Sequence, residues 1–373
     1  MTTVFTGRIR PFAPSTDIEV EAMAVDDATI VAVGSAEEIR RTYPDAKMVA
    51  LDGWVMPGLI EPHGHPGFAT ILLSDLVVDL RPVVVPRAED VVAALRTAVA
   101  EADGEPVFAN GWDSLLQRGL PDPDIRFLDD LAGRVPLVVI HNSGHSVYFN
   151  TAAALAAGID RTTPDPVGAS FGRDAEGELT GVALEAAAVE MVVAPMLATA
   201  QEHLPRILPA HLRDLAARGI TTVSDLSWNR GLDPLIDALR AKGAMPVRLR
   251  WYEMSRPGGM PSARGGGDAF FRQTGVKTWS DGSPWVGNIA TSFPYLDTRR
   301  PVRSDSSPTT SGGRTTPRTS SRPSPSPMPP RAGSWPVTRT GTARSMRPST
   351  STRRSSRGTD SPIIASGWST AAP

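Results

Sequence analysis

The chain has 373 residues, no cysteine, 40% hydrophobic and 21% charged residues, and a formal net charge of −2. This length suits one large α/β domain or two smaller domains with their own hydrophobic cores. Without cysteine, disulfides, thiolate metal sites and cysteine nucleophiles are excluded. No segment approaches the ~20 apolar residues that span a bilayer, and the N-terminus does not resemble a signal peptide. We therefore expect no membrane contact and a cytoplasmic location.

The near-neutral total conceals two regions of opposite charge. Residues 299–373 contain 13 arginines, no lysine and two acidic residues, whereas residues 1–298, with 25 basic and 38 acidic residues, carry −13. Ser, Thr, Pro and Arg dominate this tail and no apolar periodicity survives, so we expect it to be disordered. A non-catalytic binding or regulatory protein that uses the Arg-rich tail is one alternative function, although we do not favour nucleic acid as a partner.

Residues 1–57 are predicted to form a β-rich segment of short strands and turns. Two apolar runs, residues 20–25 and 29–34, flank an Asp-Asp turn, which favours a pair of short strands. Ser35 stands three residues before Glu38, a spacing typical of the capping box that begins a helix.

Two histidines follow the next apolar strand. Residues 57–65 read Pro-Gly-Leu-Ile-Glu-Pro-His-Gly-His. Because residues i and i+2 share a face of an extended strand, His63 and His65 can direct both imidazoles toward one point. Neutral imidazole is the commonest side chain to bind a metal ion in this way. The alternative is a pair of hydrogen-bonded structural histidines.

The segment around His63 and His65 resembles the first barrel strand of the amidohydrolase superfamily, where this motif supplies two metal ligands. Further segments are similar, in order, to amidohydrolase family 3. They are residues 110–113, 141–150, 154–159, 177–185, 219–225, 247–253 and 276–283. The resemblance implies an α/β fold, with an incomplete (β/α)8 metal-dependent hydrolase barrel at residues 58–298, the small sandwich portion at 1–57 and the disordered tail at 299–373.

This resemblance also implies the chemistry. Members of the family hydrolyse a non-peptide carbon–nitrogen bond, of the amide or formamide type, by metal-activated water, so a small amide-like molecule is the expected substrate. The expected cofactor is a divalent metal, with zinc favoured, as one or two ions. Lys277 lies in a segment similar to the family strand that ends in Lys-x-x-x-Asp-Gly, with Asp281 and Gly282 following. In binuclear members such a lysine is carbamylated and bridges two metals, and the alternative is a strand lysine that extends to solvent.

Three further residues are candidates for substrate binding. They are Trp112, His145 and Glu185. Each has a structural alternative: a packing tryptophan, a hydrogen-bonded loop histidine and a solvated helical acid. His203 and His211 lie in a predicted amphipathic surface helix, and we assign them no chemistry.

The later ligands that the resemblance implies are absent from the printed sequence. No histidine follows His211, and the general-base aspartate of the eighth strand is missing, so no catalytic base can be assigned. A one-base shift of reading frame permits a His-x-x-Gly-Asp-Arg-Ala-like motif near residues 337–344 and an Arg-x-Glu-His-like motif near residues 368–370. We therefore predict a frameshift after about residue 300, a C-terminally truncated product and impaired hydrolysis, with a functionless gene product as the extreme case.

Overall fold

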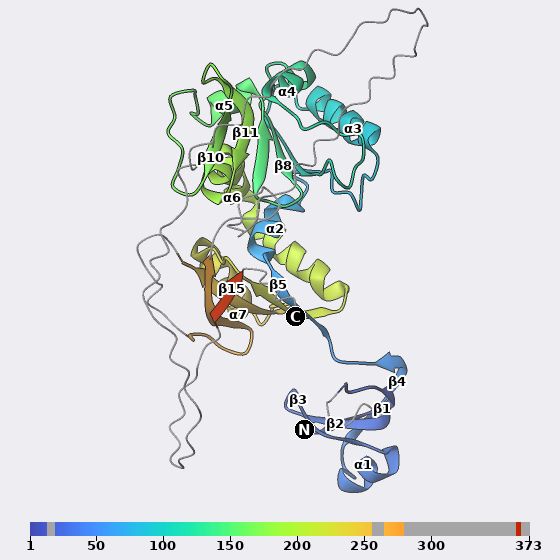
Figure 1. The fold of residues 1–373 in the computed structure, drawn as a ribbon. Coiled ribbons are helices and arrows are strands. Elements are labelled where there is room, and N and C mark those ends of the chain that lie inside the picture. The colour runs from blue at the N-terminus through green and yellow to red at the C-terminus, as the bar shows by residue number, and fades with distance from the viewer. Residues whose placement is uncertain (13–18, 256–264, 280–362, 367–373) are drawn as a thin grey trace, which may run out of the picture. The chain divides into compact units, whose positions relative to one another are not determined.

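The structure, a computed structural model, describes residues 1–12, 19–255, 265–279 and 363–366. The chain divides into two compact units: Met1–Thr70 with Pro205–Lys277, and Ile71–Leu204 with Thr278–Pro373. Each unit contains its own β-sheet structure (Figure 1). The sequence did not indicate the boundaries near residues 71 and 204, which cut through the segment that was expected to form one partial barrel.

The first unit begins with a four-stranded sheet in the order β3-β2-β1-β4. Its elements are β1 (Thr3–Ile9), β2 (Val20–Asp26), β3 (Thr29–Gly34), α1 (Ala36–Thr42) and β4 (Lys47–Val55). A small core of Val4, Ala22, Ala24 and Ile39 joins α1 to the sheet. The side chain of Ser35 accepts a hydrogen bond from the backbone N–H of Glu38 at 3.2 Å, which confirms the predicted helix start.

A second sheet is built mainly from parallel strands of the first unit. Its order is β15-β14-β13-β12-β5. The strands are β5 (Leu59–Gly64), β12 (Ile220–Asp225), β13 (Arg248–Met254), β14 (Phe271–Trp279) and β15 (Ile363–Ser366). Pairing is parallel from β5 through β12 and β13 to β14, so the carboxyl ends of these four strands lie at one edge. In open α/β sheets, that edge is where ligands bind.

The predicted α/β class is confirmed, whereas the predicted incomplete (β/α)8 barrel is not confirmed. Among the described strands, none of the three sheets closes on itself. Leu59 and Ile60 of β5 are 53% and 67% exposed, which is not the burial of a strand inside a closed barrel.

Most of the tail that was expected to be disordered, residues 299–373, lies outside the described residues. Four of its residues, Ile363–Ser366, form the short strand β15 next to β14. This differs from the expectation of a tail without structure. The physical reason is that Ile363 and Ile364 are its most apolar pair, and β14 offers an edge with unpaired backbone groups.

The second unit contains a six-stranded mixed sheet in the order β10-β11-β9-β8-β7-β6. Its strands are β6 (Val78–Asp79), β7 (Val107–Trp112), β8 (Leu137–His141), β9 (Ser146–Phe149), β10 (Ser170–Arg173) and β11 (Leu179–Leu184). Its helices include α3 (Ala88–Glu101), α4 (Ile125–Ala132) and α5 (Thr151–Ala156). Leu80, Leu95, Trp112 and Leu128 are fully buried in its core, so this unit has a hydrophobic interior of its own.

Two helices connect the units in sequence. They are α2 (Pro66–Leu72) and the 32-residue α6 (Ala186–Ala217). Neither these nor any other helix in the described part of the chain combines the length and apolar character needed to cross a membrane.

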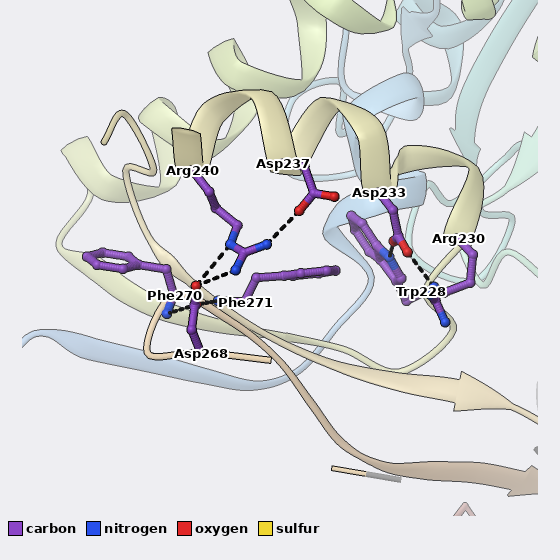
Figure 2. Close-up of polar contacts among 8 residues, drawn as sticks. All are labelled: Trp228, Arg230, Asp233, Asp237, Arg240, Asp268, Phe270 and Phe271. Atoms are coloured by element: carbon purple, nitrogen blue, oxygen red, sulfur yellow. Dashed lines mark hydrogen bonds and ion pairs between the residues drawn. The ribbon is translucent and has the colours of Figure 1, made fainter. Parts of the chain in front are cut away.

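A polar network fixes α7 (Asp233–Ala241) to the turn that precedes β14, as Figure 2 shows. Arg240 pairs with both Asp237 and Asp268. Asp268 also accepts backbone hydrogen bonds from Phe270 at 2.7 Å and Phe271 at 2.9 Å. These bonds hold the pKa of Asp268 well below its usual range. The turn and the helix therefore depend on one carboxylate.

We expect Asp268→Ala to lower the midpoint of thermal unfolding by a few degrees, because two turn N–H groups and Arg240 lose their acceptor. Asp237→Ala is the matched control, since Asp237 is more exposed and forms an ion pair with the same arginine, Arg240. Circular dichroism at neutral pH measures both. Equal midpoints for the two variants would contradict this assignment.

Candidate functional site

His63 and His65 lie where β5 ends, at the carboxyl edge of the parallel strands. Both side chains are exposed, and their ring centroids are 6.2 Å apart with the planes nearly perpendicular. Two imidazoles that bind one ion tetrahedrally through nitrogens at ~2.1 Å have ring centroids about 5 Å apart, so a shared ion requires these two rings to move about 1 Å closer. A Cβ on Gly64 would lie 3.1 Å from the carbonyl oxygen of Ser224, so the residue between the histidines packs closely against β12.

The neighbouring strand β12 supplies a buried carboxylate to the same edge. Asp225 is 1% exposed and pairs in register with Gly64. Its Oδ2 accepts a hydrogen bond from the backbone N–H of Gly67 at 2.8 Å, and its Oδ1 accepts one from Ser227 at 2.9 Å. Burial raises the pKa of Asp225, and the two backbone hydrogen bonds oppose that rise.

The hydroxyl of Ser227 completes this group. Ser227 Oγ lies 2.8 Å from Nδ1 of His65, across 162 positions of sequence. Sequence reasoning identified residues 219–225 as a strand but gave Asp225 and Ser227 no role. The available signal was position alone: polar residues that directly follow a parallel strand lie at the edge where sites form.

Lys277 reaches this edge from β14. It is 3% exposed, which is not the exposed ammonium of a lysine that extends to solvent. Burial lowers the pKa of Lys277. Partial burial lowers the pKa of His63, the charge of the Lys277 ammonium lowers it further, and the charge of Glu61 raises it. Lys277 is therefore close enough to His63 for its charge to act on that imidazole. Asp281 and Gly282 of the predicted motif lie outside the described residues.

The three predicted substrate-binding residues all lie in the second unit. Trp112 is fully buried, stacks edge-on against Phe127 and Tyr148, and donates from Nε1 to the carbonyl of Pro121 at 3.2 Å. It therefore cannot contact a substrate in this structure, and the packing alternative for Trp112 describes its position.

His145 and Glu185 lie together. His145 Nδ1 is 3.0 Å from Glu185 Oε2, and Glu185 is 8% exposed, which does not fit a solvated helical acid. Glu185 has a φ of 69°, and its backbone N–H donates to the carbonyl of His145. A non-glycine residue in this left-handed region is strained, so the surrounding structure must impose this conformation.

Of the histidines given no role, His141 forms a hydrogen bond between its Nδ1 and Ser143. Burial lowers the pKa of both His141 and His211.

No three side chains of the His, Cys, Asp or Glu types are grouped to hold a metal ion within residues 1–12, 19–255, 265–279 and 363–366. Two imidazoles lie at the carboxyl ends of the parallel strands, while the Asp225 carboxylate there accepts two backbone N–H groups and the amine of Lys277 is buried. Nitrogen donors of this kind suit Zn²⁺ and the later transition metals.

Comparisons with known proteins find similarity to amidohydrolases. A sequence model described as "Amidohydrolase family" matches residues 50–316, and one described as an imidazolonepropionase-like composite domain of bacteria matches residues 22–46. The chain is 27% identical over 246 residues to putative amidohydrolase YtcJ of Bacillus subtilis, covering 64% of this chain and 43% of that protein. It is 29% identical over 257 residues to N-substituted formamide deformylase of Arthrobacter pascens, covering 67% and 45%.

A solved structure is similar in fold. It is an uncharacterized metal-dependent hydrolase from Pyrococcus horikoshii OT3, with a TM-score of 0.53 and 18% sequence identity, covering 77% of this chain and 56% of that one. The chain spans less than half the length of the two curated relatives that it matches.

We expect Lys277→Met to raise the pKa of His63, because removal of the ammonium removes a charge that disfavours the imidazolium. NMR titration of the histidine Cε1–H signals in metal-free buffer without carbon dioxide measures this shift. Lys242→Met, at the end of α7, is the control and should leave the pKa of His63 unchanged. An unchanged or lower pKa of His63 in Lys277→Met would contradict the proximity of the two side chains.

Proposed function

The chain belongs to the amidohydrolase family, in its family 3 branch, and on that premise we propose that it is a metal-dependent hydrolase of a non-peptide carbon–nitrogen bond whose ion is held by His63 and His65. The proposed substrate is a small amide or formamide. Zinc is the proposed ion, because imidazole is a preferred ligand of Zn²⁺. The relative that is named a formamide deformylase supports the class of bond.

One observation carries this proposal. His63 and His65, with ring centroids 6.2 Å apart, end the strand β5 at the carboxyl edge of four parallel strands. Open α/β sheets and (β/α)8 barrels both place their active sites at the carboxyl ends of their parallel strands. Both side chains are exposed, and this exposure favours metal ligands over structural histidines of the interior.

The roles of the residues follow from their positions. His63 and His65 bind the ion, and Glu61 orients the turn by accepting the backbone N–H of His63 at 2.8 Å. A divalent cation supplies, when bound, polarisation of a carbonyl oxygen and activation of water at neutral pH. Lys277 would contribute a further ligand as a carbamate: its neutral amine, which burial favours by lowering the pKa of Lys277, would add to carbon dioxide with release of one proton, and the product would supply a carboxylate donor. The buried position of Lys277 beside His63 supports this role.

We extend the proposal to His145 and Glu185 as substrate-binding residues of the second unit. Support comes from their 3.0 Å contact and from the strained backbone of Glu185. Strain of this kind concentrates at functional sites, because selection for stability alone would remove it. Glu185 orients the imidazole of His145 by holding its Nδ1.

We also propose that the four parallel strands are the first part of a (β/α)8 barrel and that hydrolysis by the chain as printed is impaired. The sequence supports this, since no histidine follows His211 and no candidate for the general-base aspartate could be assigned. Ion binding by His63 and His65 does not require those later residues.

We expect His63→Ala and His65→Ala each to weaken Zn²⁺ binding at least tenfold, because each removes one imidazole ligand. Competition with a chromophoric chelator measures the affinity. His203→Ala, in the middle of α6, is the matched control and should bind as the wild type does.

Zinc-loaded wild-type protein should show little or no turnover of amides and N-substituted formamides. Rapid turnover of these substrates would contradict the proposed impairment. Wild-type Zn²⁺ affinity in both His63→Ala and His65→Ala would contradict the metal assignment.

The frameshift is tested directly by resequencing the DNA that encodes residues 297–303. We expect one inserted or deleted base relative to a frame that restores the two His-containing motifs, because the shifted tail permits both in order. An unbroken frame that encodes the Arg-rich tail would refute the frameshift.

A further inference from the structure

We propose that Ser227 is a positioning residue for His65: its hydroxyl accepts a hydrogen bond from Nδ1–H and so presents Nε2 of His65 to the metal ion. This inference rests on the proposed function. It is carried by the 2.8 Å contact between Ser227 Oγ and His65 Nδ1, which joins two segments 162 positions apart.

The chemistry of imidazole requires such a partner. A histidine binds an ion through one ring nitrogen, and the hydrogen bond made by the other nitrogen sets the tautomer and the angle of the ring. Because Ser227 engages Nδ1, the nitrogen assigned to the ion is Nε2. Metal ligands without this support lose affinity, since the ring must be ordered when the ion binds.

Ser227 can hold His65 only if Ser227 is itself held, and Asp225 provides that restraint. One carboxylate oxygen of Asp225 accepts the backbone N–H of Ser227 at 2.9 Å. The other accepts the N–H of Gly67, in the first turn of α2, at 2.8 Å. Since α2 begins directly after His65, the chain and three hydrogen bonds form a closed ring, here called the circuit. The chain links His65 to Gly67, and the hydrogen bonds link Gly67 to Asp225, Asp225 to Ser227, and Ser227 to the His65 ring.

Trp228 fixes the far side of this circuit. Its backbone N–H donates to the carbonyl of Tyr252 on β13 at 3.2 Å, and its Nε1 donates to Asp233 at 2.7 Å (Figure 2). Its ring lies edge-on to Phe271 of β14, with centroids 5.6 Å apart. The residue that follows Ser227 is therefore tied to three elements, which leaves little freedom for the Ser227 hydroxyl to move away from His65.

The space around Gly67 shows how closely the circuit is packed. A Cβ at Gly67 would lie 3.1 Å from Oδ2 of Asp225, 3.2 Å from Leu232 and 3.3 Å from the Trp228 ring. A side chain at this position would require these neighbours to shift by a few tenths of an ångström. The start of α2 is therefore closely packed against the Asp225 carboxylate, which supports Ser227.

The test compares full-length wild type with Ser227→Ala, Ser227→Thr and Ser224→Ala. Ser224 precedes Asp225 on β12, so its side chain projects to the opposite face, and it serves as the matched control. The first measurement is the tautomer of His65 in metal-free protein at alkaline pH, from ¹⁵N and ¹³C chemical shifts of the imidazole. We expect the Nδ1–H form in wild type, Ser224→Ala and Ser227→Thr, and a shift toward Nε2–H in Ser227→Ala.

The second measurement is Zn²⁺ affinity, by chelator competition. We expect Ser227→Ala to bind about 10–100-fold more weakly, Ser227→Thr to recover most of the loss, and Ser224→Ala to match the wild type. Thermal unfolding verifies that each variant is folded, because a general loss of structure would lower affinity without a change of tautomer.

The outcomes separate this inference from the proposed function. Wild-type tautomer and affinity in Ser227→Ala, with binding lost in His65→Ala, overturn the positioning role and leave the metal site standing. If wild type binds no Zn²⁺ but Ser227→Ala changes the His65 tautomer, the hydrogen-bond role stands and the metal function fails. A loss of affinity equal in Ser227→Thr and Ser227→Ala, without a tautomer change, also overturns the proposal.

Discussion

The parallel pairing of β5 with β12 is the interaction on which the candidate site depends. It places Gly64 opposite Asp225, and from that register follow the contacts of Asp225 with Gly67 and of Ser227 with His65. The same sheet continues through β13 to β14 and so brings Lys277 near His63. None of these contacts is local in sequence, so the site exists only when the sheet is formed.

The sequence predicted the parts of the site that follow from short-range pattern. The spacing of His63 and His65 after an apolar strand predicted two imidazoles on one side, and their rings lie 6.2 Å apart. Their role as ligands stays a prediction. The roles of Ser227 and Asp225 could not be predicted, because their contacts with His65 and Gly67 depend on a strand register that joins residues some 160 positions apart.

Two further differences between the sequence analysis and the structure have physical causes. Trp112 follows a glycine in a segment that resembles the family, but six consecutive buried residues in β7 place it in a core. The division at residues 71 and 204 escaped the sequence because α2 and α6 run across it without a Pro- or Gly-rich linker, which is the usual sign of a boundary. The pair β2 and β3 near the N-terminus could be predicted, since β2 alternates and the turn at residues 27–28 is short.

The insertion of Ile71–Leu204 between β5 and its partner strand has a consequence for biosynthesis. On the ribosome, β5 emerges long before β12, so the backbone groups of β5 that pair with β12 stay open while the intervening unit, which has a core of its own, is made. Closing so large a loop is slow because its entropy is lost before any contact compensates it. Until β12 arrives, the unpaired strand β5 is a place where a strand of another chain can add.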